Sequence, residues 1–536
     1  MNNIKILDCT LRDGGYINDW NFGLQNIMSI LTRLEKANVD IIECGFLEDG
    51  EYNQDLSMFT NVDQIESILP ARNESTQYVA MTRYGFLNID HLNPYDGKSI
   101  NGIRVTFHED EVLEAIEFCK QIQAKGYRTY VQPVGTTSYS DKYLLNLIDL
   151  VNDIKPYAFY IVDTLGLMRK SDLLRMFYLV DHNLNSDIVI GYHSHNNLQL
   201  AFSNAQELAD VHTKRQIIID SSVYGMGRGA GNLNTELITQ HLNSLKDRSY
   251  NTDYLLEIVD ETIGPLLEKY TWGYSVPYYL AAINNCHPNY ASYLMNRKTL
   301  PVKSISKILN HITNDKRELY SESYVQELYT QYQKHQIDDS KSIENLKTIF
   351  MNKEILIVAP GSSVKGAKSR IKQFQDSTGA VIITVNFEGD GIDPDFCFFS
   401  NDKRYQKFSG LKSNESSKQL ILSSNIQEDI YPDSLLVNYS DLINAQPLVN
   451  DNATLMLLTL LIKLGVNKVS IAGFDGFHSN SNDNYADQNL ETDLDNEIKM
   501  MMNAQIKEEI LKYSQVLEFE FMTESLFNPM NTEVLI

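Results

Sequence analysis

Short apolar runs alternate with amphipathic stretches through the first half of the chain. Each run is rich in β-branched residues and ends in polar or glycine residues, and the apolar positions of the stretch that follows recur at helical spacing. Strands that alternate with helices predict parallel βαβ units. The eight expected strands are residues 4–9, 39–44, 77–81, 102–107, 128–133, 158–162, 188–192 and 216–220. Eight such units predict a closed (β/α)8 TIM barrel, with a doubly wound open sheet as the alternative.

The second half of the chain has two further parts. Tyr- and Leu-rich stretches between residues 246 and 350 predict helices that decorate the barrel, pair with another subunit in a homo-oligomer, or bridge to the next domain. After them, KEILIVAPGSSVKG indicates a strand, a glycine turn and a helix, and further apolar runs follow, so an open Rossmann-like α/β sheet is expected. The Asn- and Asp-rich run 479–495 is expected to be a surface loop. We therefore expect domains over residues 1–245, 246–350 and 351–536.

Composition and charge narrow the partners and the compartment. The chain has 536 residues and a net charge of -24, which argues against a nucleic-acid partner because no excess of cations is available to replace phosphate counterions. The 5 cysteines are scattered without a C-x-x-C pair, as is typical of thiols in a reducing compartment. The start has no apolar segment of a secretory signal, and no apolar run reaches the ~18 residues of a membrane helix. A cytoplasmic soluble protein without a membrane span is expected.

Polar side chains that follow the expected strands are candidates for catalysis, because catalytic groups of a parallel barrel lie at the C-terminal ends of its strands. His193 and His195 follow the seventh strand two residues apart, which puts both imidazoles on one side of an extended chain. Asp13 follows the first strand, which is not remote from the seventh in a closed barrel. Two imidazoles and a carboxylate would bind a divalent cation and leave positions open for substrate oxygens. Without Asp13, a pair of surface or hydrogen-bonded histidines would explain the pattern equally well.

Other residues at strand ends have both a structural and a functional interpretation. Arg12 is a salt-bridging residue of the rim, or a fixed cation that faces a carboxylate or a developing enolate oxygen. Glu43 is a buried structural carboxylate, or a general acid or base that could also orient a metal-bound water. Thr164 caps the next helix or holds a substrate carboxylate. The glycine-rich run 225–231 is a tight loop or cradles an anion with its amides, and Asn232 offers one more oxygen to the metal.

Five motifs resemble those of the DRE-TIM metallolyases, also called the HMG-CoA lyase-like family, which includes 4-hydroxy-2-oxovalerate aldolase and the isopropylmalate synthases. In chain order the motifs are LDCTLRDGGY, IIECGF, VDTLG, GYHSHNN and GMGRGAGN. The resemblance covers roughly residues 1–290. It implies a barrel in which Asp13, His193 and His195 bind Mn, Mg or Zn. It also implies that Arg12 stabilises the enolate of a pyruvate-like substrate.

The same resemblance implies roles for three more residues and shows two departures. Asn232 matches a further metal ligand, Glu43 matches a glutamate that assists acid–base chemistry, and Thr164 matches a position near the substrate carboxylate. The aldolases have a histidine base where this chain has Tyr16, which could serve as acid or base although an ordinary Tyr pKa near 10 is far from ideal at neutral pH. The synthases that use acyl-CoA tend to have Gln where this chain has Gly15.

The expected activity is that of a metal-dependent aldolase or lyase. It would form or cleave a carbon–carbon bond through the enolate of a 2-oxo acid, with an aldehyde as the second small-molecule substrate. A Claisen-type synthase that uses acyl-CoA is the alternative among enzymes. A non-catalytic barrel kept as a scaffold is disfavoured, because the set of Asp13, His193 and His195 is intact.

The second α/β domain resembles bacterial sialyltransferase-like or motility-accessory-type glycosyltransferase domains, through APGSSVKG, VNF and FFSNDKRY. Those domains bind a nucleotide sugar with a glycine-rich first turn and an Asn after the second strand. The resemblance therefore implies contacts from Gly361, Ser362 and Asn386, with Asp475 as a further polar contact. It also implies a dual protein of surface polysaccharide biosynthesis, whose barrel makes a precursor of the activated sugar. A Rossmann-like domain without a nucleotide is the alternative.

Overall fold

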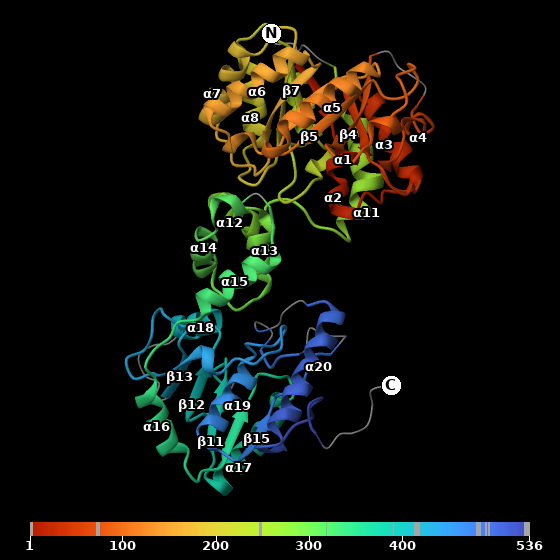
Figure 1. Ribbon diagram of the computed structural model, residues 1–536. Helices are drawn as coiled ribbons and strands as arrows, with labels where there is room; N and C mark the ends of the chain where they lie inside the picture. The colour runs from red at the N-terminus through yellow and green to blue at the C-terminus, as the bar shows by residue number, and fades with distance from the viewer. Residues whose placement is uncertain are drawn as a thin grey trace. The chain divides into compact units, whose positions relative to one another are not determined.

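The chain folds into two compact units, which are described one at a time (Figure 1). The first contains Met1–Ser292 and Ile312–Tyr320, and the second contains Tyr293–His311 and Ser321–Ile536. The computed structural model describes residues 4–70, 75–245, 249–317, 319–389, 391–411, 419–478, 484–487, 490 and 494–529. The run 479–495, expected to be a surface loop, lies largely outside the described residues.

Eight parallel strands close a barrel in the first unit. They are β1 (Ile4–Asp8), β2 (Ile41–Leu47), β4 (Gln77–Arg83), β5 (Gly102–Phe107), β6 (Arg128–Pro133), β7 (Ala158–Asp163), β8 (Val189–Ser194) and β9 (Ile217–Ser221). Each strand pairs with the next, and β1 pairs with both β9 and β2, which closes the ring. The short strand β3 (Met58–Phe59) extends the sheet beside β2. The (β/α)8 barrel predicted from the sequence is therefore confirmed.

Alternate residues of each barrel strand face two different cores, because successive side chains of a strand point to opposite faces. On β1, Ile6 packs in the outer core between strands and helices, whereas Leu7 packs in the barrel interior. On β2, Ile41 faces the interior and Ile42 faces the outer core. Both faces are buried, so the strands are almost continuously apolar, as is usual for parallel sheets.

Amphipathic helices cover the outside of the barrel. They are α3 (Leu24–Lys36), α4 (Val62–Glu66), α5 (Val112–Ala124), α6 (Asp141–Ile154), α7 (Lys170–Asn183), α8 (Ala201–Asp210) and α9 (Thr235–Ser244). Helix α6 shows why these segments are helical. Its residues Leu144, Leu147, Ile148 and Val151 lie on one face at helical spacing and are buried. Its N-cap, Ser140, accepts a hydrogen bond from the backbone N–H of residue 143.

The segment after the barrel is helical and belongs partly to each unit. Its helices are α10 (Thr252–Ile258), α11 (Gly264–Leu267), α12 (Val276–Ile283), α13 (Pro288–Asn296), α14 (Val302–Asn310), α15 (Glu322–Gln333) and α16 (Ser340–Phe350). The chain passes from the first unit to the second after Ser292, returns at Ile312, and leaves again after Tyr320. Within the residues that the structure describes, every helix is too short or too polar to span a lipid bilayer.

The second unit is built on an open, fully parallel sheet of seven strands. The strands are β10 (Ile355–Val358), β11 (Val381–Val385), β12 (Phe396–Phe399), β13 (Gln419–Ser423), β14 (Leu435–Val437), β15 (Lys468–Ala472) and β16 (Glu518–Phe521). Their spatial order is β14-β13-β12-β11-β10-β15-β16, and all pairs are parallel. The Rossmann-like open α/β sheet predicted for this part of the chain is therefore confirmed.

Helices cover both faces of this sheet. The helices α17 (Val364–Thr378) and α18 (Asp402–Leu411) pack on one face, where Leu356 and Val358 of β10 are buried beneath α17. The helices α16, α19 (Ala453–Lys463) and α20 (Asn496–Tyr513) pack on the other face, over Ile355 and Ile357. Helix α19 is apolar on almost every side because it is buried by neighbouring helices as well as by the sheet.

Candidate active site

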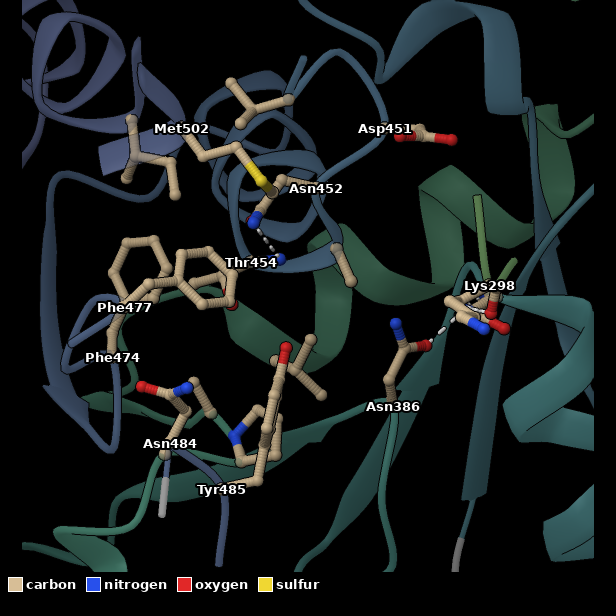
Figure 2. A pocket seen from close by; sticks show the side chains of 18 of the residues that line it. Lys298, Asn386, Asp451, Asn452, Thr454, Phe474, Phe477, Asn484, Tyr485 and Met502 are labelled. Atoms are coloured by element: carbon tan, nitrogen blue, oxygen red, sulfur yellow. Dashed lines mark hydrogen bonds between the residues drawn. The ribbon is translucent and has the colours of Figure 1, made fainter. Parts of the chain in front are cut away.

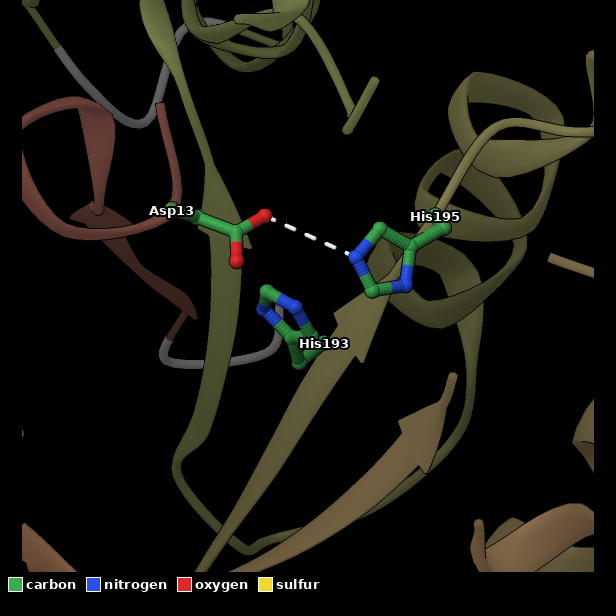
Figure 3. Close-up of side chains that lie close together, drawn as sticks. All are labelled: Asp13, His193 and His195. Carbon is green, nitrogen blue, oxygen red and sulfur yellow. Dashed lines mark ion pairs between the residues drawn. The ribbon is translucent and has the colours of Figure 1, made fainter. Parts of the chain in front are cut away.

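Three predicted ligand residues meet at the C-terminal end of the barrel. Asp13 ends α1 (Thr10–Asp13), the short helix that follows β1, and His193 and His195 lie at the end of β8. One carboxylate oxygen of Asp13 and one ring nitrogen of each histidine all lie within 4.8 Å of one another. The closest ion pair, from His195 Nε2 to Asp13 Oδ2, measures 3.5 Å (Figure 3). The geometry is that of a three-residue cation site on matching strand ends.

The protonation states of these residues suit a divalent cation. Burial lowers the pKa of His193 against the opposing effect of Asp220, so this imidazole is neutral at physiological pH and can ligate. Burial alone would raise the pKa of Asp13, but Arg12 and His195 hold it well below its ordinary value. Asp220 Oδ2 lies 3.0 Å from His193 Nδ1, which leaves the Nε2 atom of that ring for an ion.

Asn232 and His195 each have a buried polar atom that lacks a partner. The Asn232 Nδ2 atom donates to Asp13 Oδ2 at 2.5 Å, while Asn232 Oδ1 has no hydrogen-bond partner. The Nδ1 atom of His195 is also buried and unpartnered. Unpaired buried polar atoms are costly, so the free Asn232 Oδ1 acceptor beside the three candidate ligands fits a bound ion. The residues present therefore fit a divalent cation.

Arg12 is a buried cation with one unused donor. Its Nε atom donates to Glu43 Oε2 at 2.8 Å, its Nη1 atom pairs with Asp13, and its Nη2 atom is buried without a partner. Burial alone would lower the pKa of Arg12, but Glu43 and Asp13 raise it above its ordinary value, so the guanidinium stays charged. A fixed cation with a free N–H beside a cation site can bind a substrate oxygen.

Two charged residues inside the barrel extend this arrangement, and the sequence interpretation did not identify them. The Arg104 side chain is fully buried on β5, where its Nη1 atom lies 2.9 Å from Glu43 Oε2 and its Nη2 atom pairs with Asp220. Its guanidinium also lies 4.7 Å from the ring centroid of Tyr160. A continuous chain of ion pairs therefore runs from Asp220 through Arg104, Glu43 and Arg12 to Asp13, and the neutral His193 contacts Asp220 at its other end; we call this set the interior charge network. The available signal was a single charge within each of two apolar strands, GIRVTF and IIIDS.

Tyr16 lies at the rim, where an aldolase-like chain was expected to have a base. Its ring is 42% exposed, packs edge-on against Trp20 at 4.8 Å between centroids, and lies 5.4 Å from Arg228 Cζ. Partial desolvation raises its pKa, so its hydroxyl is protonated at neutral pH. Packing explains why the neighbouring residue 15 is a glycine, because a Cβ atom there would lie 2.0 Å from the Trp20 indole ring.

A cavity of about 830 Å³ opens at this rim. Tyr16 and Thr164 both line it, and Thr164 Oγ1 accepts a hydrogen bond from the Gly135 N–H at 2.9 Å. The charged lining residues are Arg83, Arg175, Arg228, Arg317 and Asp172. Arg83 and Arg175 form ion pairs with Glu111 and Asp141, whereas Arg228 and Arg317 form none among the described residues, so this part of the lining is cationic. Such a cavity favours an anionic substrate.

In the second unit, the structure brings three of the four predicted contacts to one cavity. Gly361, Asn386 and Asp475 line it, and Ser362 does not. The Asp475 carboxylate accepts hydrogen bonds from the N–H and hydroxyl of Ser363 at 2.9 and 2.5 Å, at the start of α17. A protein carboxylate thus occupies the end of the helix where a phosphate on the glycine turn would bind. Gly361 is required by a close approach, because a Cβ atom there would lie 2.3 Å from the Gly473 carbonyl oxygen.

Comparison with known proteins finds relatives of part of the chain. Residues 3–261 match the HMGL-like family. A 4-hydroxy-2-oxovalerate aldolase of Pseudoalteromonas translucida is 24% identical over 270 residues, which are 50% of this chain and 77% of that protein. 4-hydroxy-2-oxovalerate aldolase 2 of Comamonas testosteroni is 25% identical over 238 residues, 44% of this chain and 67% of that protein. The N-terminal domain of a putative aldolase from Bacteroides vulgatus is a similar solved structure, with 26% identity, coverage of 55% of this chain and 96% of that chain, and a TM-score of 0.46.

Proposed function

We propose that the chain is a divalent-metal-dependent aldolase that acts through the enolate of a 2-oxo acid. The match of residues 3–261 to the HMGL-like family supports an enzyme of the carbon–carbon lyase class. The observation that carries this proposal is the buried cluster of Asp13, His193 and His195 beside the free donor of Arg12. The 4-hydroxy-2-oxovalerate aldolases among its relatives support the same reaction class.

Four side chains would hold the cation. They are Asp13, His193 and His195, with Asn232 through its unpartnered Oδ1 atom. When bound, a divalent ion such as Mn, Mg or Zn supplies a Lewis acid that lowers the energy of the enolate. The carboxylate of Asp220 would keep the ring of His193 in the required tautomer and orientation.

Arg12 would bind the carboxylate or keto oxygen of the 2-oxo acid through its Nη2 atom. Glu43 and Asp13 fix this guanidinium from two sides, so it needs no rearrangement when negative charge develops on the substrate. Because Glu43 Oε2 already accepts from Arg12 and forms an ion pair with Arg104, its proposed part is to orient Arg12, with Oε1 left as a further acceptor. Thr164 lies where a second substrate group would enter the cavity.

Tyr16 is proposed as a proton donor. A hydroxyl whose pKa is raised holds its proton at neutral pH, so it can stabilise an aldehyde oxygen or its alkoxide by hydrogen bonding. Tyr16 stands at the position in the sequence where the aldolases have their histidine. Another group or a water molecule would then act as the general base. A Claisen-type synthase is separated from the aldolase by its product, because only the synthase releases a free thiol from acetyl-CoA.

Proton exchange at the methyl group of pyruvate tests the proposal. In deuterated water, we expect NMR to show exchange with Mn, Mg or Zn present, loss of exchange after treatment with a chelator, and its return when the ion is added back. The enolate forms without an aldehyde, so the assay does not depend on the unknown second substrate. Exchange that continues at an unchanged rate in chelator-treated protein would contradict the metal-dependent mechanism.

Arg228 should contribute to substrate affinity. It lines the cationic cavity and has no acidic partner among the described residues. We expect Arg228→Gln to raise the KM for the 2-oxo acid about tenfold with little change in kcat, since a half-buried charge-assisted contact is lost in both ground and transition states. Initial rates of exchange at varied pyruvate measure this. Arg128→Gln, an exposed arginine at the opposite end of the barrel, is the control, and an unchanged KM for Arg228→Gln would exclude this contact.

A further inference from the structure

The sheet of the second unit has a point where its connections diverge. Strand β10 pairs with β11 on one side and with β15 on the other. The helix that follows β10, α17, packs on one face, whereas the helix that follows β15, α20, packs on the opposite face. In open parallel sheets this divergence leaves a crevice beyond the C-terminal strand ends, which is the usual place for a ligand.

A cavity of about 400 Å³ lies at this divergence. Its lining comes from the segments that follow β10, β11, β12 and β15 and from the start of α19. The volume is within the range of small-molecule sites. Figure 2 shows that the lining is divided, with aromatic and thioether side chains on one side and polar side chains facing them.

One wall is apolar and partly aromatic. Phe474, Phe477, Tyr485 and Met502 form it (Figure 2). Phe474 is fixed from behind by Phe527 at 4.7 Å between ring centroids. Flat rings and a polarizable thioether on one wall suit a planar heterocycle better than a sugar or an aliphatic chain.

The facing wall carries polar atoms with no partner among the described residues. Asn386 is 8% exposed, and its Oδ1 atom accepts from the N–H groups of Ser400 and Asn401. Its Nδ2 atom has no partner and points into the cavity (Figure 2). Thr454, buried in the first turn of α19, has a hydroxyl without a hydrogen bond. Both residues line the cavity, so these two groups can donate hydrogen bonds to a ligand acceptor.

Positively charged side chains lie next to the polar wall. Lys298 and Arg404 line the cavity, and Lys403 is next to them. Burial lowers the pKa of Lys403, and Lys298 and Arg404 lower it further. Within the described part of the chain, none of the three forms an ion pair with an acid.

Two carboxylates also line the cavity, but Asp451 accepts a hydrogen bond from the Tyr329 hydroxyl and Asp475 accepts from Ser363. With Arg297, the lining has three cations against these two hydrogen-bonded carboxylates, a balance that favours an anionic ligand.

We infer that this cavity binds a nucleotide, with its base against Phe474 and Phe477 and its phosphate toward Asn386, Lys298 and Arg404, whose guanidinium lies 5.1 Å from the centroid of the Tyr485 ring. The phosphate lies away from the glycine turn of Gly361, because Asp475 already caps the helix there. The second unit therefore contributes a separate binding site beyond the proposed aldolase reaction.

Binding of nucleotides to the full chain tests this inference. Calorimetry and thermal shift are measured with the mono- and diphosphates of adenosine, cytidine, guanosine and uridine, with the four nucleosides, and with inorganic phosphate. We expect at least one nucleotide to bind with a Kd below about 1 mM, and its nucleoside and phosphate alone to bind at least tenfold more weakly. Absence of binding by all eight nucleotides would overturn the inference, as would equal binding of inorganic phosphate.

Three variants locate the site. Asn386→Asp keeps the oxygen that caps residues 400 and 401 but replaces the free donor by a negative charge, so we expect affinity to fall at least tenfold. Arg404→Gln and Phe477→Ala should each weaken binding about tenfold through the phosphate and the base, respectively. Arg370→Gln, an exposed arginine of α17 outside the cavity, is the matched control. Unchanged affinity in all three variants would place the nucleotide elsewhere. Circular dichroism and thermal unfolding of each variant verify that the second unit is folded.

Discussion

Asp13→Asn abolishes the metal-dependent exchange of the pyruvate methyl protons. The substitution keeps the shape of the side chain and removes the only carboxylate of the three-residue cluster. Two imidazoles and an amide hold a divalent ion much more weakly, and the Lewis acid that lowers the enolate energy is lost with it. We expect the exchange rate to fall at least about a thousandfold, which corresponds to roughly 4 kcal/mol in the barrier. NMR of pyruvate in deuterated water measures the rate, and elemental analysis measures the bound ion.

Asp19→Asn is the matched control for that experiment. Asp19 is exposed, only six positions away in the chain, and has a left-handed backbone with φ of 54° that asparagine also adopts readily. It should retain full exchange and full metal content. Full exchange in Asp13→Asn would refute the assignment of Asp13 as a ligand. A loss of exchange with full metal content would show that Asp13 acts by holding Arg12 instead.

Arg104→Met strongly destabilises the first unit. Arg104 is the cation between Glu43 and Asp220 in the interior charge network, and all three side chains are almost fully buried. Removing one partner of a buried ion pair leaves an uncompensated charge, so we expect the free energy of unfolding to fall by about 3–5 kcal/mol at neutral pH. Urea denaturation followed by fluorescence and circular dichroism measures the change.

The effect of Arg104→Met should shrink as the pH falls. Burial alone would raise the pKa of Asp220, but Arg104 and His193 hold it below its ordinary value. A carboxyl with a lowered folded-state pKa contributes stability above its unfolded pKa, and loses it as the pH falls through the folded value. Without Arg104, Asp220 can relieve its unpaired charge by taking a proton. The difference between wild type and variant is therefore largest at neutral pH and smaller near pH 4.

Arg128→Met separates this effect from a general loss of arginine in the barrel. Arg128 begins β6, is exposed, and lies over the ring of Tyr157 at 4.9 Å. Its replacement should change the unfolding free energy far less than that of Arg104. If the two variants unfolded at the same urea concentration, the interior charge network would have no net part in stability.

The barrel strands were predictable where apolar runs are bounded by clear turn signals. The runs 102–107 and 128–133 match β5 and β6 at both ends. Strand β2 extends beyond its predicted end at residue 44, because Gly45 continues the strand through an irregularity with φ of 146°. In a sequence, a glycine after an apolar run predicts the end of a strand. Here Gly45 lets the backbone of β2 lie close to the Ser57 carbonyl oxygen. Strand β16 was missed because its four residues alternate at an exposed edge of the sheet.

The candidate ligands were predictable for a different reason. Asp13, His193 and His195 follow strands, and a barrel brings the ends of its parallel strands to one rim. Arg104 and Asp220 lie within strands, where a single charge in an apolar run does not reveal whether it faces outward or inward. Only the closed barrel shows that both face the interior and that each neutralises the other. The polar wall of Asn386 and Thr454 joins segments far apart in the chain, so no local pattern could have revealed it.

The chain crosses between the two units three times, so cutting it at one position does not separate them. The first unit takes back Ile312–Tyr320 after residues 293–311 have joined the second. A single break at residue 292 would therefore leave Arg317, a lining residue of the barrel cavity, on the fragment that carries the other unit. A break at residue 320 would leave α14 behind with the barrel. No single cut divides the chain into the two units as the structure has them, so a fragment that ends at either position carries residues of both units or lacks residues of its own.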